Sequence, residues 1–287
     1  MAIWRQKERI AIGFGRDRIR VLVARGNGSL EAVYSGQGSL PEGALLDTLK
    51  APVFGDRGVI LEALRTCIAE ARHQGYLRRN PELVSVVVPD GSVKLASVPI
   101  QGPAPRRAEG DEMARWALRN LWPVPAEETR TVWSIAGQGT NGETSDEWLV
   151  SLGAQEALVR EYEQLVQQLE WTVGRLVPWT MAAAASAEPD SDLIVCDGAG
   201  TLACLFEVQG VPRFHRAWRA RVPPEQLRQE LPRLERYVND RLEASIGRVW
   251  LCGQDEWMET AAAAATEAKL EVSAVSPEVA LLGALSG

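Results

Sequence analysis

The feature that most constrains this chain is a pattern of three short strands and two turns that opens each half of the sequence. The strands of the first copy are expected at 10–14, 19–24 and 30–34, and those of the second copy at 193–196, 202–208 and 211–218. Apolar runs separated by short glycine-rich segments are typical of antiparallel strands joined by tight turns. A unit that occurs twice indicates an internal duplication, and two related lobes that face each other would bring both first turns to one cleft.

The first turn of the second copy has a composition that suits phosphate binding. It follows Asp197 and contains Gly198, Ala199 and Gly200. A turn of small residues can direct several backbone N–H groups at one point, where a phosphate binds. An Asp at the end of the preceding strand can hold Mg²⁺ through water. Most Asp-Gly turns only reverse the chain, so this motif alone does not assign a nucleotide site.

Length and composition exclude several classes of protein. A chain of 287 residues can hold two domains with separate cores, and a net charge of −7 argues against nucleic acid as the main partner. The four cysteines lack metal-ligand spacing, and His73 and His215 are too few and too far apart for a metal site or a hydrolase triad. No apolar run approaches about 18 residues, so we expect a cytoplasmic protein with no direct membrane span.

The remaining sequence alternates amphipathic helices with short strands, which together with the two meanders predicts a two-lobed α/β protein. Helices are expected at 59–75, 111–122, 154–170, 181–187, 223–244, 257–268 and 278–285. Further strands are expected at 83–88, 93–98, 130–136, 147–152, 173–177, 248–252 and 270–275. The fifth helix is expected to be interrupted at Pro232, and residues 34–56, rich in Gly, Pro and Ser, are expected to form a loop.

Several conspicuous residues have a plain structural interpretation. Asp90 follows a buried strand and Pro89, and a hairpin turn explains it without chemistry. The two histidines are expected to be surface residues or core filler. The arginines at 16, 18 and 20 alternate with apolar residues, so they are expected on a solvated strand face.

Tryptophan is frequent in the middle of the chain. Trp116 and Trp122 on one helix, with two more on the neighbouring strands, are most simply the core of a small subdomain. A sharper alternative is a groove that binds a peptide, because aromatic residues and Arg are enriched at contact surfaces. The candidates on its exposed side are Arg115, Arg119 and Trp122.

Six segments occur in an order and spacing that resemble a known family. They are Val84–Asp90 with Val98-Pro99, Leu121–Glu128, Trp148–Leu152 with the helix after it, Gly174–Pro178, Ile246–Gly253 and Ser276–Leu285. Over nearly its whole length the chain resembles the actin-like ATPase superfold, and within it the type IV pilus assembly protein PilM family. It is also similar to the cytoplasmic domain of the type II secretion protein GspL.

The resemblance implies a ribonuclease H-like, two-lobed α/β fold with four subdomains. Residues 1–188 would form the first lobe, with an inserted small subdomain at about 83–147. Residues 189–287 would form the second lobe, with a small helical subdomain at about 219–246. Members of this superfold bind ATP between the two lobes.

The nucleotide motifs of this chain depart from those of the superfold. The first phosphate turn has Gly13 where an Asp is usual, keeps Gly15, and has Arg16 in place of a hydroxyl residue. The second keeps Asp197, the one expected Mg²⁺ ligand if Mg·ATP binds, with Gly198, Gly200 and Thr201 after it, although Ala199 replaces a Gly. The adenosine loop has Gly253 followed by Gln254 instead of paired glycines. Loss of the first carboxylate makes hydrolysis improbable, so no catalytic residue is assigned, and binding of ATP and Mg²⁺ stays open.

The same resemblance implies that the chain is a scaffold of a pilus or related secretion machine. Its partner would be the N-terminal cytoplasmic tail of an inner-membrane PilN-like protein, which would place the chain at the inner face of that membrane. The tail is expected in the cleft between the first lobe and its inserted subdomain, by strand addition or groove docking. Other pilus-machine subunits and self-association into a ring are further candidates. The alternatives are an ATP-binding, slowly hydrolysing ATPase of the same machine and a filament-forming protein.

Overall fold

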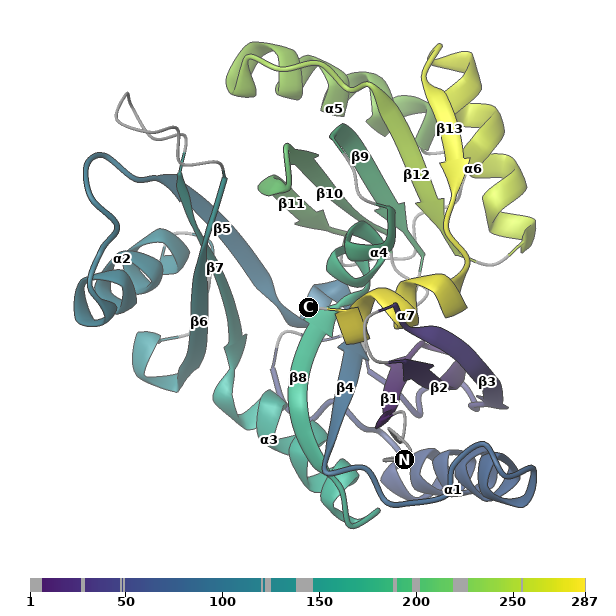
Figure 1. The fold of residues 1–287 in the computed structure, drawn as a ribbon. Helices are drawn as coiled ribbons and strands as arrows, with labels where there is room; N and C mark the ends of the chain where they lie inside the picture. Colours follow the sequence, from purple (N-terminus) through teal and green to yellow (C-terminus); the bar gives the residue numbers. More distant parts are fainter. Residues whose placement is uncertain are drawn as a thin grey trace, which may run out of the picture.

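The computed structural model describes residues 7–26, 29–46, 48, 50–119, 121, 125–137, 147–187, 190–197, 202–218, 227–253 and 255–286. These residues contain two five-stranded sheets with the strand orders β3-β2-β1-β4-β8 and β11-β10-β9-β12-β13. Each sheet consists of an antiparallel three-stranded meander followed by two parallel strands. The duplication predicted from the sequence is therefore a duplication of sheet topology, and the predicted two-lobed α/β architecture is confirmed (Figure 1).

The strands have the following bounds. The first sheet contains β1 (Lys7–Phe14), β2 (Arg18–Gly26), β3 (Glu31–Ser39), β4 (Leu83–Val88) and β8 (Thr172–Pro178). The second contains β9 (Ser191–Cys196), β10 (Ala203–Val208), β11 (Val211–Ala217), β12 (Arg248–Cys252) and β13 (Glu271–Ala274). In the first sheet Gly13 lies opposite Arg20 on the neighbouring strand. Residues paired in this way present their side-chain positions on the same face of the sheet.

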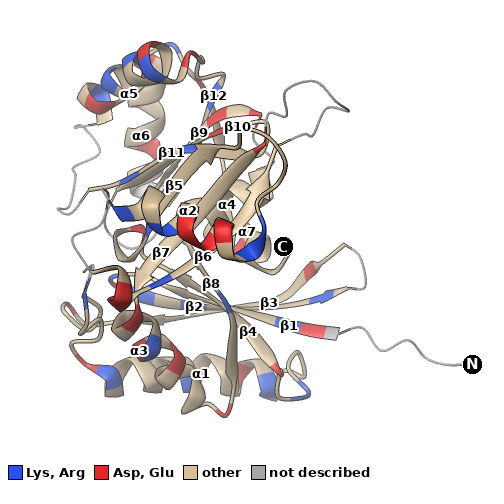
Figure 2. Cartoon of the chain, turned by 90° about the vertical axis from the view of Figure 1, so that its left-hand side faces the viewer, with Lys and Arg blue, Asp and Glu red and all other residues tan. Residues whose placement is uncertain are grey.

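Helices cover both outer faces of the two sheets and fill the space between them (Figure 1). Helices α1 (Arg57–His73) and α3 (Glu156–Gln167) pack on the outer face of the first sheet. Helices α5 (Leu227–Leu242) and α6 (Asp255–Glu267) pack on the outer face of the second, and positive and negative residues alternate along α5 (Figure 2). Helices α4 (Trp179–Ala187) and α7 (Pro277–Ser286) form the central layer.

Small residues allow the two central helices to approach closely. A Cβ atom at Gly283 of α7 would lie only 2.2 Å from the carbonyl oxygen of Ala182 of α4. Ala182, Ala183 and Ala184 of α4 are buried, because both sheets contact this helix. The Ala-rich run is thus a helix that belongs to the core between the lobes rather than to one lobe.

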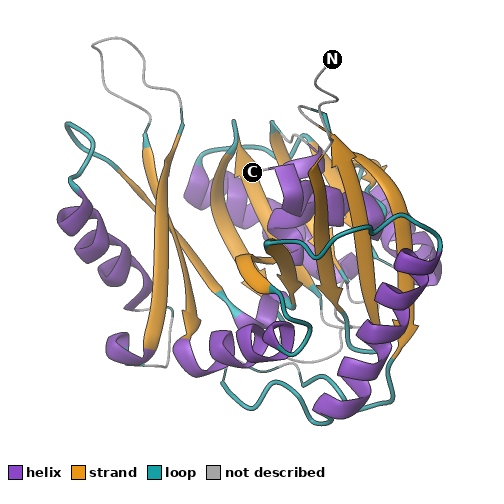
Figure 3. Cartoon of the chain, turned by 60° about the horizontal axis from the view of Figure 1, so that its bottom comes forward, coloured by secondary structure: helices purple, strands orange, loops and turns teal. Residues whose placement is uncertain are grey.

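A three-stranded sheet with one helix stands to one side of the two lobes (Figures 1 and 3). It consists of β5 (Lys94–Pro99), α2 (Arg107–Arg119), the short 3₁₀ helix Ala126–Glu128, β6 (Thr129–Ala136) and β7 (Trp148–Gln155), in the strand order β5-β7-β6. This unit, called the inserted subdomain below, spans 94–155 instead of about 83–147. The boundaries move because β4 pairs with β1 and β8, while β7 completes the smaller sheet.

The core of the inserted subdomain differs from the expected one. The buried face of α2 contains Gly110, Ala114 and Leu118, and the exposed fraction of Trp116 is 64%. The interpretation of Trp116 as a core residue is therefore wrong. Trp133 of β6 explains the choice of face, because a Cβ atom at Gly110 would lie 2.2 Å from its ring. A large indole on the sheet requires the smallest residues of the helix above it.

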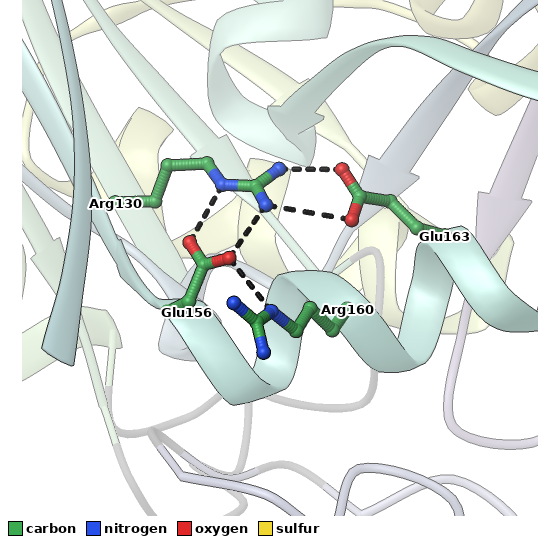
Figure 4. Close-up of polar contacts among 4 residues, drawn as sticks. All are labelled: Arg130, Glu156, Arg160 and Glu163. Atoms are coloured by element: carbon green, nitrogen blue, oxygen red, sulfur yellow. Dashed lines mark hydrogen bonds and ion pairs between the residues drawn. The ribbon is translucent and has the colours of Figure 1, made fainter.

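A group of ion pairs connects the inserted subdomain to the first lobe (Figure 4). The Arg130 guanidinium on β6 contacts Glu156 at 2.8 Å and also binds Glu163, both on α3, and Arg160 approaches Glu156 to 2.9 Å. Hydrogen bonds from Arg130 lower the pKa of Glu156 to about 2 and raise the pKa of Arg130. A bidentate pair within a network holds two elements in register better than an isolated surface pair does.

Two further expectations are wrong in detail. Strand β3 continues to Ser39, into the segment expected to be loop, because backbone pairing with β2 needs no side chain and Gly38 admits Ala63 of α1. Pro232 lies inside α5 and does not interrupt it. Its missing N–H removes one hydrogen bond, which burial of Leu231 and Leu234 on either side offsets.

A buried carboxyl group on β10 predicts a pH-dependent stability. Glu207 is 8% exposed, its Oε2 has no hydrogen-bond partner among the described residues, and burial raises its pKa from 4.5 to about 7. Between these values the folded protein keeps a proton that the unfolded chain has lost, so the free energy of unfolding falls as pH rises. The wild type should therefore lose stability relative to Glu207→Gln as the pH rises from about 5 to about 8. The difference in the free energy of unfolding should change by at most about 3 kcal/mol over this range.

Urea unfolding at these two pH values measures the effect. The matched control is Glu31→Gln, at an exposed carboxyl group of β3, which should change stability by the same small amount at both pH values. A Glu207→Gln curve parallel to that of the wild type would show that Glu207 is ionised in the folded protein.

Candidate functional site

Three of the residues predicted to bind nucleotide, Gly13, Asp197 and Gly253, lie where the two sheets face each other across α4 and α7 (Figure 1). Gly13 at the end of β1 contacts Trp179 of α4 and Leu281 of α7. Arg20, opposite Gly13, is close enough to Glu278 of α7 and Cys252 of β12 for their charges to affect its pKa. The structure thus brings the first turn and the end of β12 to one region between the lobes.

The position of the missing carboxylate is filled by an indole ring. A Cβ atom at Gly13 would lie 2.6 Å from Cζ2 of Trp179 and 2.9 Å from Cδ2 of Leu281. Trp179 is fully buried, and its Nε1–H donates a hydrogen bond of 2.9 Å to the carbonyl oxygen of Phe14. The ring is therefore held against the strand end by packing and by a buried hydrogen bond. An Asp at position 13 would require displacement of this ring.

The rest of the first turn is an ordinary turn in which Gly15 is buried and Asp17 is exposed. The Gly15 amide donates to the carbonyl oxygen of Arg18 at 2.9 Å, which closes it. Arg16 is partly exposed, and its guanidinium lies 3.5 Å from the carboxylate of Glu42, which is 89% exposed. Such a long and solvated ion pair contributes little to stability.

The second turn and the adenosine loop meet at the ends of β9 and β12. The Asp197 amide donates to the carbonyl oxygen of Cys252 at 2.9 Å. A Cβ atom at Gly253 would lie 2.8 Å from the ring of Trp257 and 3.5 Å from Cβ of Asp197. The glycine thus admits an indole of the protein itself at the place where the sequence suggested a nucleotide. Four of the residues predicted to bind nucleotide lie outside the described residues: Gly198, Gly200, Thr201 and Gln254.

A buried arginine was missed by the sequence interpretation. Arg20 is 6% exposed, whereas the alternation of arginines predicted a solvated face. Burial lowers its pKa, and its Nε has no hydrogen-bond partner among the described residues. A guanidinium beside Gly13 repels a divalent cation at the same place, because Coulomb forces are weakly screened in a buried site. The residues at the first turn therefore fit a bound Mg²⁺ ion poorly.

A second buried polar cluster was also missed, and it connects the lobes. Asp90 begins the short 3₁₀ helix Asp90–Ser92 after β4, and it is 3% exposed. Its carboxylate accepts hydrogen bonds from the amide and hydroxyl of Thr180 on α4 and lies 3.1 Å from Nε2 of His215 on β11. The expectation that Asp90 is a plain hairpin turn is wrong. The sequence signal that could have revealed this cluster is an Asp at the carboxyl end of a buried parallel strand.

The chemistry of this cluster is structural. The Asp90 carboxylate accepts a hydrogen bond from the Thr180 hydroxyl and contacts His215, so its polar partners all belong to the protein. Thr180 is fully buried and the His215 side chain is 1% exposed, so a substrate cannot reach them. Nearby, the Arg213 guanidinium on β11 stacks 3.7 Å above the ring of Trp148 on β7. Together these contacts join the second lobe to the first and to the inserted subdomain.

The predicted peptide-binding residues lie on the outer side of α2. Arg115, Trp116 and Arg119 are exposed there, and Trp122 is outside the described residues. Among the described residues eight large apolar side chains are exposed, and half of them belong to the inserted subdomain: Trp116, Leu121, Val132 and Ile135. Strand β6, which contains the last two, is also an edge of its sheet. Exposed apolar residues beside an open strand edge are typical of a partner site.

The described part of the chain has neither a membrane span nor a cluster of metal ligands. Each of its helices is too short or too polar to traverse a bilayer. Its His, Cys, Asp and Glu side chains nowhere gather in a group of three or more that could hold a metal ion.

Comparisons with known proteins identify the fold. No protein-family model matches the sequence, and no curated protein matches it. The PilM-PilN type IV pilus biogenesis complex contains a chain with 15% identity and a TM-score of 0.75, covering 96% of this chain and 90% of that one. The cytoplasmic domain of EpsL, an inner-membrane component of the type II secretion system of Vibrio cholerae, has 14% identity and a TM-score of 0.57, covering 98% and 96%.

A third solved structure names the fold directly. It is a protein of unknown function with an actin-like ATPase fold from Bacteroides thetaiotaomicron, with 10% identity and a TM-score of 0.50, covering 96% of this chain and 95% of that one. This chain has the actin-like ATPase fold, as the sequence predicted. At such low identities the likeness establishes the fold and not the activity.

Proposed function

We propose that this protein is a scaffold of a type IV pilus or related secretion machine and does not hydrolyse nucleotide. It binds the N-terminal cytoplasmic tail of an inner-membrane PilN-like protein, which holds it at the inner face of that membrane. The likeness to PilM in its complex with PilN, over 96% of this chain, supports the partner. The likeness to the cytoplasmic domain of EpsL supports a secretion machine of this general kind.

The packing of Trp179 on Gly13 is the main support for the proposal that this protein does not hydrolyse nucleotide. Phosphoryl transfer by this fold needs an acidic group near the first turn to organise a cation and the attacking water. Here the first turn has no carboxylate at position 13, and an indole ring with a buried hydrogen bond fills its place. The buried charge of Arg20 disfavours a cation at the same face.

The tail site proposed here is the inserted subdomain. Its sheet has an open edge at β6, while β5 at the other edge lies beside β11 of the second lobe. An extended tail can add to β6 through main-chain hydrogen bonds, with specificity from side-chain contacts. Trp116 supplies a large exposed aromatic surface beside Arg115 and Arg119, and such residues dominate binding energies at interfaces.

The test measures binding of the tail peptide and of Mg·ATP to the whole protein. A synthetic peptide of the N-terminal tail of the PilN-like partner should bind in calorimetry, and Trp116→Ala should weaken the affinity about tenfold or more. The matched control is Tyr237→Ala, an exposed aromatic of the second lobe, which should leave the affinity unchanged. Failure of the tail to bind the wild type would refute the scaffold proposal.

The second measurement is thermal unfolding with and without millimolar Mg·ATP, where no shift is expected. A ligand at a hundred times its Kd would stabilise the fold by about 2.7 kcal/mol, which raises the melting temperature by several degrees. Such a shift, with phosphate release that Asp197→Ala abolishes, would favour the alternative of a slow ATPase.

A further inference from the structure

An open hollow lies at the outer end of the first lobe, away from both sites described above. It has a volume of about 890 Å³ and is lined by the second half of α1, residues 77–80 after that helix, and residues 168–171 at the end of α3. Four arginines line it: Arg65, Arg72, Arg78 and Arg79. All four are exposed, and none forms an ion pair with a described residue. In a chain with a net charge of −7, this is a strong local excess of positive charge.

The ordinary explanation for basic residues at this place accounts for only one of them. Arg72 lies in the last turn of α1, where a positive charge stabilises the helix dipole. Arg65 lies two turns earlier, and Arg78 and Arg79 follow the end of the helix. Glu170 is the one acidic residue of the lining, and the ends of α1 and α3 each contribute a partial charge of about −0.5. About two positive charges therefore remain without compensation.

The floor of the hollow is apolar and contains an unsatisfied donor. Ile68, Leu77 and Trp171 are buried in its wall, and Leu169 is partly buried. Trp171 is 3% exposed, and its indole Nε1–H has no hydrogen-bond partner among the described residues. A buried N–H group without an acceptor costs free energy, so the wall of the hollow around Trp171 is not fully satisfied. The combination of a cationic rim and an apolar floor suits a ligand that carries both acidic and apolar groups.

We propose that this hollow binds an acidic peptide segment of a partner protein, at a site separate from the proposed tail site. Its volume is that of pockets that enclose a ligand of many atoms, much more than one phosphate ion needs. Arginine forks bind carboxylates in bidentate fashion, and the apolar floor accepts one aliphatic or aromatic side chain of the segment. A membrane surface fits less well, because the apolar residues lie inside a hollow and not on a protruding face.

The test is a selection in which the sequence of the bound peptide is itself the readout. A library of random dodecapeptides displayed on phage is selected on the whole protein, with counter-selection on Arg65→Glu/Arg79→Glu. These two arginines make no hydrogen bond or ion pair with a described residue, so their replacement leaves the fold intact, which circular dichroism checks. Peptides rich in Asp and Glu with at least one large apolar residue should be enriched. The proposal would be overturned if the peptides selected on the wild type were no richer in Asp and Glu than those bound by Arg65→Glu/Arg79→Glu.

Calorimetry with the most enriched peptide then distinguishes a site from general attraction. Its affinity should fall at least tenfold in Arg65→Glu/Arg79→Glu and remain unchanged in the control Arg236→Glu/Arg241→Glu on α5, which has the same net charge. Equal losses in both variants would show attraction to net charge alone. Complete competition by millimolar inorganic phosphate would assign the hollow to a small anion instead. Binding to vesicles of phosphatidylglycerol that only the first variant loses would assign it to a membrane.

Discussion

Restoring the missing carboxylate by Gly13→Asp should destabilise the protein by about 4 kcal/mol or more, enough to prevent folding in a marginally stable chain. The new side chain collides with the ring of Trp179 and with Leu281, and attraction between its carboxylate and Arg20 on the paired position offsets only part of this cost. Gly13→Ala adds only the Cβ atom and should cost about 1–3 kcal/mol. Urea unfolding of the soluble variants, with expression yield for Gly13→Asp, measures both.

A double variant shows whether the ring is the cause. Trp179→Ala alone leaves a cavity and should cost about 3–5 kcal/mol of stability. The double variant with Gly13→Ala should lose less stability than the two single variants lose together, because the new methyl group enters the space that the ring has left. The matched control is Gly58→Ala on α1, where a Cβ atom would meet only Oδ1 of Asp56 at 3.4 Å and stability should hold or rise. Additive costs of Gly13→Ala and Trp179→Ala would show that the ring does not fill the site.

Removal of the buried carboxylate between the lobes is the second large effect. Asp90→Ala should cost about 3 kcal/mol, because the amide and hydroxyl of Thr180 and Nε2 of His215 lose their shared partner inside the protein. Asp90→Asn keeps one acceptor for Thr180 and should cost less. Urea unfolding of both variants tests whether Asp90→Ala loses more stability than Asp90→Asn.

The matched control is Asp240→Ala, at an exposed position of α5, where a change within about 0.5 kcal/mol is expected. An Asp90→Ala variant as stable as this control would show that the cluster does not hold the lobes together.

Short-range patterns in the sequence predicted most of the elements. Alternation and glycine-rich turns located both meanders, and the periodic apolar residues of α1 placed its buried side correctly at Leu61, Leu64 and Ile68. Such signals depend on neighbours a few residues apart, so they hold whatever the topology of the fold. The same reasoning failed for α2, whose inward face is chosen by the bulk of Trp133, on a strand that follows later in the chain.

The candidate site was less accessible to this reasoning. The sequence showed that Gly13 departs from a phosphate turn, but the ring that fills its place belongs to Trp179, 165 positions after the Phe14 carbonyl to which it bonds. Likewise the partner of Asp90 is His215, from the other half of the chain. Periodicity carries no information about such contacts, because the topology of two facing sheets decides them. Arg20 was misjudged for the same reason, since its face is buried only once α7 is in place.

The position of α7 has a consequence for how the chain is made. This helix, at residues 277–286, covers the inner face of the first sheet beside β1, although the strands of that sheet end at Pro178. During synthesis at about 5–20 residues per second, the first lobe emerges several seconds before the segment that completes its core. For that interval Ala11, Leu22 and Trp179 lack part of their native covering. The nascent first lobe is therefore expected to expose part of this apolar face until α7 has been synthesised.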